Sequence, residues 1–139
     1  MNSLSQRQKA HIRRSFSRIA CCHEKTAQCF FDRLFALDPA VEPLFSSDFN
    51  VHKRKLMLML ALLISTLDQP DRFAELSRKL TERHFRYGVQ PRHYRAGREA
   101  LLWALEQNLG RQFTLPVCDA WSAFYDAILD DNARSVEGT

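Results

Sequence analysis

The sequence predicts an all-α domain, and three observations support the prediction. Apolar residues recur at steps of three and four over long stretches, which is the period of an α-helix. No stretch sustains the alternation of apolar and polar residues that is typical of a half-buried strand. Only four glycines and five prolines interrupt the 139 residues, so few breaks separate the helices.

The helices are expected where the apolar pattern runs without interruption. They cover about 3–20, 24–37, 39–45, 49–67, the segment between Pro70 and Gly88, 91–109, and a last helix from about 114 to 129. The first two have clear inward stripes, which are Ile12, Phe16 and Ile19, followed by Phe30, Phe31, Leu34 and Phe35.

Proline and polar residues set the boundaries in the first half of the chain. The second helix stops at Asp38, because a residue that precedes a proline avoids the α region. Ser47 or Asp48 can then cap the helix that carries His52, because each offers a side-chain oxygen to free backbone N–H groups.

Glycine and proline set the boundaries in the second half. Gly88 can close the fifth helix in the left-handed conformation, and Pro91 suits the first turn of the next one. Gly110 supplies another stop. Beyond Leu129 the apolar pattern ends, so residues 130–139 are expected to fray.

Length and composition favour one soluble domain over residues 1–139. Hydrophobic residues make up 45% and charged residues 26% of the chain. No apolar run approaches the roughly 20 residues that cross a bilayer. The N-terminal segment MNSLSQRQKAHIRRSF holds no apolar signal core. We therefore expect a cytoplasmic protein without a membrane partner.

Basic residues exceed acidic ones by a formal net charge of +4, and part of the excess surrounds the turn before Pro91. These residues are Arg83, Arg86, Arg92, Arg95 and Arg98. They form either a solvated face or a docking surface for an acidic partner or for anionic groups on a ligand. No recognition helix, aromatic-interleaved strand or zinc spacing accompanies them, so nucleic acid is not an expected partner.

The four cysteines, Cys21, Cys22, Cys29 and Cys118, lack the paired CxxC spacing of a zinc site. Reduced, partly buried thiols are expected, and a redox-active pair of Cys21 or Cys22 with Cys29 is the alternative. The CCH run is not a CxxCH motif, so any haem would be held without a covalent bond. No inward carboxylate pair or nucleophile elbow favours hydrolytic chemistry.

Two histidines each continue an apolar stripe at helical spacing, on two different helices. The stripes are Phe73, Leu76, Leu80, His84 and Tyr87, and His52, Leu56, Met59 and Leu63. A buried imidazole must satisfy both ring nitrogens, and neither stripe holds a carboxylate. A metal-centred cofactor is therefore a candidate.

Either histidine alone would be interpreted as a satisfied core residue, but the pair points to haem. Zinc needs further Cys, His or carboxylate ligands, which neither stripe supplies. Haem brings four nitrogens of its own, so one or two imidazoles complete the iron. The remaining histidines, His11, His23 and His93, lie among polar and charged residues and are assigned to the surface.

Segments from nearly the whole chain resemble the globin family, in particular single-domain bacterial globins with a neuroglobin-like distal pocket. They are FFDRLFALDPAVEPLF at 30–45, HKRKLM at 52–57, LTERHFRYGVQPRHY at 80–94, and the AW and FY pairs of the last helix. The resemblance implies the globin fold, a three-over-three helical sandwich around haem b.

The resemblance implies a role for each site residue. His84 becomes the proximal iron ligand, with its other ring nitrogen donating to a backbone carbonyl near Leu80. Phe45 packs flat against the porphyrin, and Phe49 closes the distal edge. The other cofactor-binding residues implied are Phe31 and Leu56 on the distal side, Leu80, Val89 and Tyr94 on the proximal side, and Lys55 with Arg83 near the propionates.

His52 takes the distal position, where two roles stay open. It can donate a hydrogen bond to the bound gas, or bind the iron as a sixth ligand that the gas displaces. Phe31 offers no hydroxyl, and its combination with His52 and Lys55 resembles neuroglobin, in which both axial ligands are histidine. This favours reversible bis-histidine coordination, whereas the short turn between Phe45 and His52 limits how far the distal helix can swing.

Two departures from the bacterial pattern bear on catalysis. Many bacterial globins have a distal tyrosine and glutamine where this chain has Phe31 and His52, which argues against efficient nitric oxide dioxygenation. The resemblance places Tyr94 beside the proximal histidine, but the position of its partner glutamate holds Val136, with Glu137 one residue further. A peroxidase-like proximal triad is therefore not expected.

Three hypotheses of function follow. The first is a haem protein that binds dioxygen, nitric oxide or carbon monoxide. The second is a haem enzyme for nitric oxide dioxygenation or peroxide turnover, which would need a separate reductase or acidic redox partner. The third is a haem-free globin that acts as an interaction module.

Overall fold

Helices account for the regular secondary structure of the described residues, as the all-α prediction requires. The computed structural model describes residues 4–45 and 48–137, with side chains up to residue 129. The α-helices are α1 (Gln6–Arg18), α2 (His23–Leu37), α3 (Phe49–Ser65), α4 (Pro70–Arg86), α5 (Pro91–Leu109) and α6 (Leu115–Glu137). Between them lie the short 3₁₀ helices η1 (Ala20–Cys22), η2 (Pro39–Leu44) and η3 (Gly110–Gln112).

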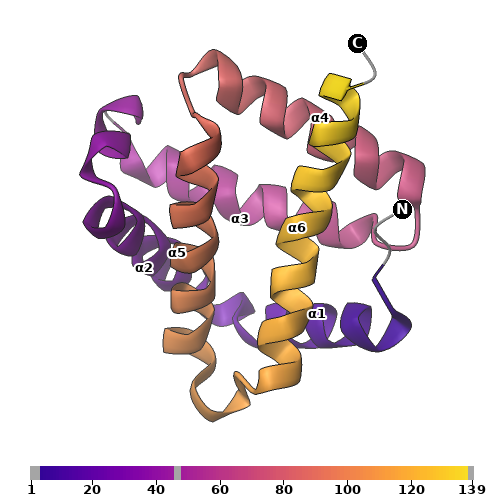
Figure 1. Cartoon of the computed structure of the whole chain (residues 1–139). Helices are drawn as coiled ribbons and strands as arrows, with labels where there is room; N and C mark the ends of the chain where they lie inside the picture. The colour runs from indigo at the N-terminus through magenta and orange to yellow at the C-terminus, as the bar shows by residue number, and fades with distance from the viewer. Residues whose placement is uncertain (1–3, 46–47, 138–139) are drawn as a thin grey trace.

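The helices cross in two layers (Figure 1). α5 and α6 run side by side, and α1, α3 and α4 cross behind them, α1 near the foot of α6 and α4 near its top. α2 packs along α5, while α1 and α4 both contact α6. The two helices that carry the inward histidines, α3 and α4, therefore belong to the same crossing layer.

The core centres on the aromatic residues of α6. Trp121 and Phe124 are fully buried, and their ring centroids lie 5.5 Å apart. Phe73 of α4 packs edge-on against Phe124, with centroids 5.9 Å apart. The Trp121 indole N–H donates to the buried Ser15 hydroxyl of α1 at 2.8 Å. These contacts hold α1, α4 and α6 together.

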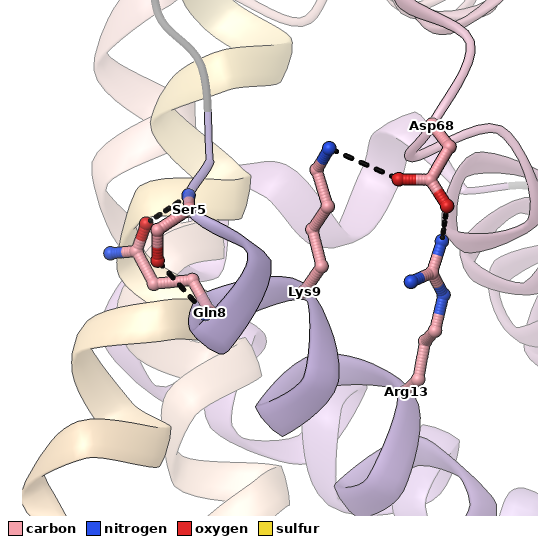
Figure 2. Close-up of polar contacts among 5 residues, drawn as sticks. All are labelled: Ser5, Gln8, Lys9, Arg13 and Asp68. Carbon is pink, nitrogen blue, oxygen red and sulfur yellow. Dashed lines mark hydrogen bonds and ion pairs between the residues drawn. The ribbon is translucent and has the colours of Figure 1, made fainter.

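Side-chain caps begin two of the helices. The Ser5 hydroxyl accepts the Gln8 backbone N–H while the Gln8 side chain accepts the Ser5 backbone N–H, both at 3.0 Å (Figure 2). This capping box starts α1 at Gln6. The Asp48 carboxylate caps α3 by accepting the backbone N–H groups of Asn50 and Val51. The alternative cap, Ser47, lies outside the described residues.

Asp68, in the turn between α3 and α4, ties that turn to α1. Its carboxylate accepts hydrogen bonds from Lys9 at 3.1 Å and Arg13 at 2.8 Å (Figure 2). The hydrogen bond from Lys9, followed by that from Arg13, lowers the pKa of Asp68. The exposed network therefore favours the ionised carboxylate.

The turn between α4 and α5 depends on Gly88, whose φ is +92°. A side chain disfavours this region of φ, so a glycine ends α4 at little conformational cost. The next N–H, that of Val89, donates to the His84 carbonyl at 3.0 Å. Pro91 then opens α5 as its first residue, as the sequence predicts.

Two aromatic residues lie where the sequence pattern did not place them. Tyr87, predicted inward, is 65% exposed because α4 ends at Arg86 and helical spacing no longer fixes its direction. His93, assigned to the surface, is only 7% exposed. Its Nδ1 accepts the Gln90 N–H at 2.9 Å, and its Nε2 lies 3.8 Å from the Asp38 carboxylate. The first turn of α5 therefore faces the end of α2.

The other two histidines assigned to the surface are partly covered. His11 and His23 are both half-buried. The His23 ring lies 5.2 Å from the Phe16 ring, and its Nε2 is covered. The prediction of a frayed end over 130–139 falls on residues whose side chains lie outside the description, although helix α6 extends to Glu137. The side chains of Val136 and Glu137 also lie outside the described part of the chain.

Candidate functional site

His84 lies in the last turn of α4 with one ring nitrogen fixed by the backbone. Its Nδ1 lies 2.7 Å from the Leu80 carbonyl oxygen. A carbonyl only accepts, so Nδ1 carries the proton and Nε2 keeps a lone pair. Within the described part of the chain, nothing hydrogen-bonds to Nε2. This is the tautomer that binds a metal through Nε2.

Burial keeps the His84 ring neutral. Desolvation lowers its pKa, the hydrogen bond to the Leu80 carbonyl opposes that shift, and the charge of Arg83 lowers the pKa further. A metal binds an imidazole only in the neutral form. The ring is therefore prepared as a ligand at neutral pH.

His84 occupies the middle of the inward face of α4 but is not fully covered. Ser77 and Thr81 are 0% and 3% exposed, and Leu80 on the other side is half-buried. Successive residues lie about 100° apart around a helix, so His84 falls between the side of α4 with Ser77 and Thr81 and the side with Leu80. Part of the His84 residue therefore stays accessible although it lies on an inward face.

Tyr94 of α5 packs against the His84 ring. The two ring centroids lie 6.4 Å apart at 69°. Tyr125 of α6 donates its hydroxyl hydrogen to the Tyr94 carbonyl at 2.8 Å. Gly97 permits this approach, because a Cβ there would lie 2.7 Å from the Tyr125 hydroxyl oxygen. Burial raises the pKa of both phenols, so both stay neutral.

An aromatic cluster joins α2, the end of η2 and the start of α3. Its members are Phe31, Phe35, Phe45 and Phe49. Phe31 lies 5.2 Å from Phe45 and 5.7 Å from Phe49, measured between ring centroids. Phe35 lies 5.7 Å from Phe45 and 5.5 Å from Phe49. The edge-to-face angles of these pairs suit the charge distribution of aromatic rings.

His52, in the first turn of α3, lies against this cluster. Its ring meets Phe45 at a centroid distance of 5.3 Å and an angle of 87°. Phe49 lies 6.3 Å from it. The ring is half-buried, and no hydrogen bond to it occurs among residues 4–45 and 48–129. Phe45 and Phe49 thus pack against an imidazole whose two ring nitrogens have no hydrogen-bond partner among the described residues.

The remaining predicted residues differ in how they meet the site. Leu56 packs against both the aromatic cluster and the main core. Leu80 and Val89 are both half-buried. The Leu80 carbonyl accepts a hydrogen bond from His84 Nδ1, and the Val89 N–H donates to the His84 carbonyl. Lys55 is exposed and forms no ion pair with any described residue. Lys53, two residues earlier, is largely buried, since only 11% of its side chain is exposed.

These donors fit haem better than a bare metal ion. In the described ranges no three His, Cys, Asp or Glu side chains converge to hold an ion, and zinc would need at least that many. Haem needs only one or two imidazoles. His84 and His52 each offer a nitrogen with no competing hydrogen bond, and the aromatic cluster offers the apolar wall that a porphyrin requires.

A surface groove of about 600 Å³ lies between α2 and α3, apart from these residues. Its lining includes His23, Lys53, Arg54 and Met57, but neither His52 nor His84. No helix in the described residues is long and apolar enough to cross a membrane. The candidate site is therefore the one around His52 and His84, not this groove.

Sequence reasoning placed Phe35 on the inward face of its helix but not in the site. Its position one helical turn after Phe31 is the signal that could have found it, since residues four apart share a face. Gly97 and Tyr125 were missed as a supporting pair. Their contact joins α5 to α6, and no local pattern reports it.

Comparison with known proteins agrees with the all-α fold. A family model described as Globin matches residues 28–131. Neuroglobins are similar over almost the full length. That of Tetraodon nigroviridis is 28% identical over 148 residues, covering 96% of this chain and 93% of the relative. That of Danio rerio has the same identity and coverage, and that of Chaenocephalus aceratus is 28% identical, covering 93% and 90%.

Globins are haem proteins that bind diatomic gases, and the matched region contains both histidines and the aromatic cluster. Since that region takes in most of the chain, and the helical fold agrees with it, this protein belongs to the globin family.

Proposed function

We propose that this globin binds haem b through His84 and uses it to bind dioxygen, nitric oxide or carbon monoxide. The observation that supports this assignment is the hydrogen bond from His84 Nδ1 to the Leu80 carbonyl, which leaves Nε2 neutral and free. Bound haem would supply a ferrous iron that accepts a gas molecule. The Leu80 carbonyl would orient the ligand and increase its basicity.

The apolar residues around the two histidines would hold the porphyrin and exclude water. Phe45 and Phe49, in contact with His52, would meet its distal face and edge. The other contacts proposed are Phe31, Leu56, Leu80, Val89 and Tyr94. Lys55 and Arg83 are exposed cations that form no ion pair with a described residue, and we assign them to the propionates.

We further propose that His52 is a reversible sixth ligand of the iron. Its ring has no hydrogen-bond partner among the described residues, and Phe45 and Phe49 restrict its position. The His52 side chain would have to leave the iron before a gas molecule binds there. Gas binding would then include the cost of moving an imidazole that packs on two phenylalanines.

Turnover of nitric oxide or peroxide would need an external electron donor, and we propose an acidic redox protein for that role. Arg86, Arg92 and Arg95 are exposed and make no ion pair with any residue in the described ranges. Phe85 and Tyr87, which flank Arg86 in sequence, are 79% and 65% exposed. Arginine with aromatic residues is typical of protein interfaces. Reduction by such a donor should slow as salt increases.

A haem titration followed by visible spectroscopy tests the binding proposal. The protein should take up one haem per chain and develop a Soret band. Without added gas, the ferrous form should show the sharp visible bands of a six-coordinate iron. Replacing His52 by Ala should abolish those bands, while His11→Ala on α1 should keep them.

The outcomes separate the alternatives. A five-coordinate spectrum in the parent protein would assign His52 to hydrogen bonding with the gas instead of direct coordination. A protein that stays colourless after haem supplementation would leave only the interaction-module hypothesis. We also propose that residues 1–139 act as one globin domain in the cytoplasm. Proteolysis and cell fractionation would test those assignments.

A further inference from the structure

Cys21 and Cys22 place two thiols side by side at the corner between α1 and α2. Their sulfur atoms lie 3.3 Å apart. Both are free thiols, Cys21 exposed and Cys22 half-buried. Cys21 also donates weakly to the Arg18 carbonyl. The pair belongs to the helical turn η1 and the residue before α2, so the backbone on both sides constrains it.

Adjacent cysteines are poorly placed to form a disulfide. Consecutive Cα atoms are about 3.8 Å apart across a trans peptide, whereas disulfides usually join Cα atoms about 4.4–6.8 Å apart. The two thiols therefore remain available for a ligand that bridges them.

The sulfur separation favours a bridging atom with a narrow angle between its two bonds to sulfur. With bonds to sulfur of about 2.3 Å, as in soft metal thiolates, sulfurs 3.3 Å apart subtend an angle of about 90°. This angle matches the pyramidal geometry of a trivalent arsenic centre. It is narrower than the tetrahedral angle of zinc and far from the linear geometry of two-coordinate copper(I).

The third position of the bridging atom must be filled by the ligand itself. Over the described residues, no three His, Cys, Asp or Glu side chains converge. An organic arsenical supplies a carbon in that position. A groove of about 500 Å³ lies beside the pair, lined also by Lys25, Gln28 and Cys29, and it has room for an aromatic ring.

We propose that Cys21 and Cys22 form a chelating dithiol site for trivalent organic arsenicals. An aryl arsonous acid, which carries two hydroxyl groups on arsenic, would condense with both thiols. Two S–H and two As–O bonds break, and two As–S and two O–H bonds form, so that two water molecules leave. No oxidation state changes. The hydrogen bond with Cys21 raises the pKa of Cys22, so Cys22 reacts as a protonated thiol, and its proton leaves in one of the two water molecules.

Intact-protein mass spectrometry with phenylarsine oxide as the probe tests the site. The full chain should gain one arsenical per molecule. A small dithiol should remove it, and glutathione, a monothiol, should not. Cys21→Ser and Cys22→Ser, made separately, should each weaken binding by about 100-fold, because the second bond is then no longer intramolecular. Cys118→Ser is the matched control and should bind as the parent does, because Cys118 does not line the groove.

Two results would overturn the proposal. One is unchanged binding in both Cys21→Ser and Cys22→Ser, with circular dichroism showing that the variants are folded. The other is equal loss in Cys29→Ser, which would move the chelate into the groove. If one serine variant fails to fold, the second variant and Cys21→Ala keep the comparison decisive. None of these readouts depends on haem, so failure here and failure of the haem proposal are distinguishable.

Discussion

The Leu80 carbonyl oxygen accepts a hydrogen bond from His84 Nδ1 at 2.7 Å, one turn earlier on the same helix. The backbone of α4 therefore fixes both the tautomer and the orientation of the ring. Because this contact lies within one helix, it forms with the helix and does not need a ligand to organise it. Local structure thus sets the tautomer that leaves Nε2 with a lone pair.

Replacing Phe35 by Ala should destabilise the protein by about 3 kcal/mol, because the ring contacts three other members of the aromatic cluster. Urea denaturation would measure the free energy of unfolding. Phe85→Ala is the matched control and should change stability by less than about 0.5 kcal/mol, since Phe85 is 79% exposed. Equal effects of the two substitutions would contradict the packing described for Phe35.

Ser15→Ala should lower the free energy of unfolding by about 2 kcal/mol, because the buried Trp121 indole N–H loses its acceptor. Ser17→Ala, on the exposed side of the same helix, should be nearly neutral. Thermal or urea unfolding of both variants would check this. If Ser15→Ala were as stable as Ser17→Ala, the Trp121 hydrogen bond would make no net contribution.

Gly97→Ala should lower the free energy of unfolding more in the parent protein than in the Tyr125→Phe variant. The added Cβ would lie 2.7 Å from the Tyr125 hydroxyl oxygen, and Tyr125→Phe removes that atom. A double-mutant cycle on the free energy of unfolding should give a coupling of about 1 kcal/mol or more. Additive effects of the two substitutions would show that the hydroxyl moves aside freely.

Asp68 should contribute to stability in a pH-dependent way. Lys9 and Arg13 lower its pKa in the folded state, so the contribution is present above the unfolded value of about 3.9. It is lost as the pH falls through the folded pKa, where the carboxylate is protonated. The stability difference between the parent and Asp68→Asn should therefore shrink with acid and with added salt. A difference that is constant from neutral pH to acid would contradict this.

The helix boundaries were largely predictable because each depends on neighbouring residues. Asp48 caps α3, Gly88 ends the turn after α4, and Pro91 opens α5. The His84 hydrogen bond to Leu80 was equally accessible, since it spans one turn. Interactions between residues close in sequence set all of these features, so one sequence is enough to predict them.

The residues that were misplaced or missed depend on contacts between distant elements or, for Tyr87, on where a helix ends. His93 looks polar and exposed in its local context, but Asp38 at the end of α2 lies 3.8 Å from it. Tyr87 continues the apolar stripe by count, but the helix ends one residue earlier. Phe35 carries the right periodicity, and only the packing of η2 and α3 shows that it touches Phe45 and Phe49.

The central claim is that His84 holds the iron of haem, and the visible spectrum of His84→Ala tests it most directly. The parent protein and His11→Ala should both show a Soret band after haem addition. In His84→Ala the band should be lost or shifted to that of free haem, with circular dichroism confirming the fold. An unchanged Soret band and one bound haem in His84→Ala would contradict the assignment.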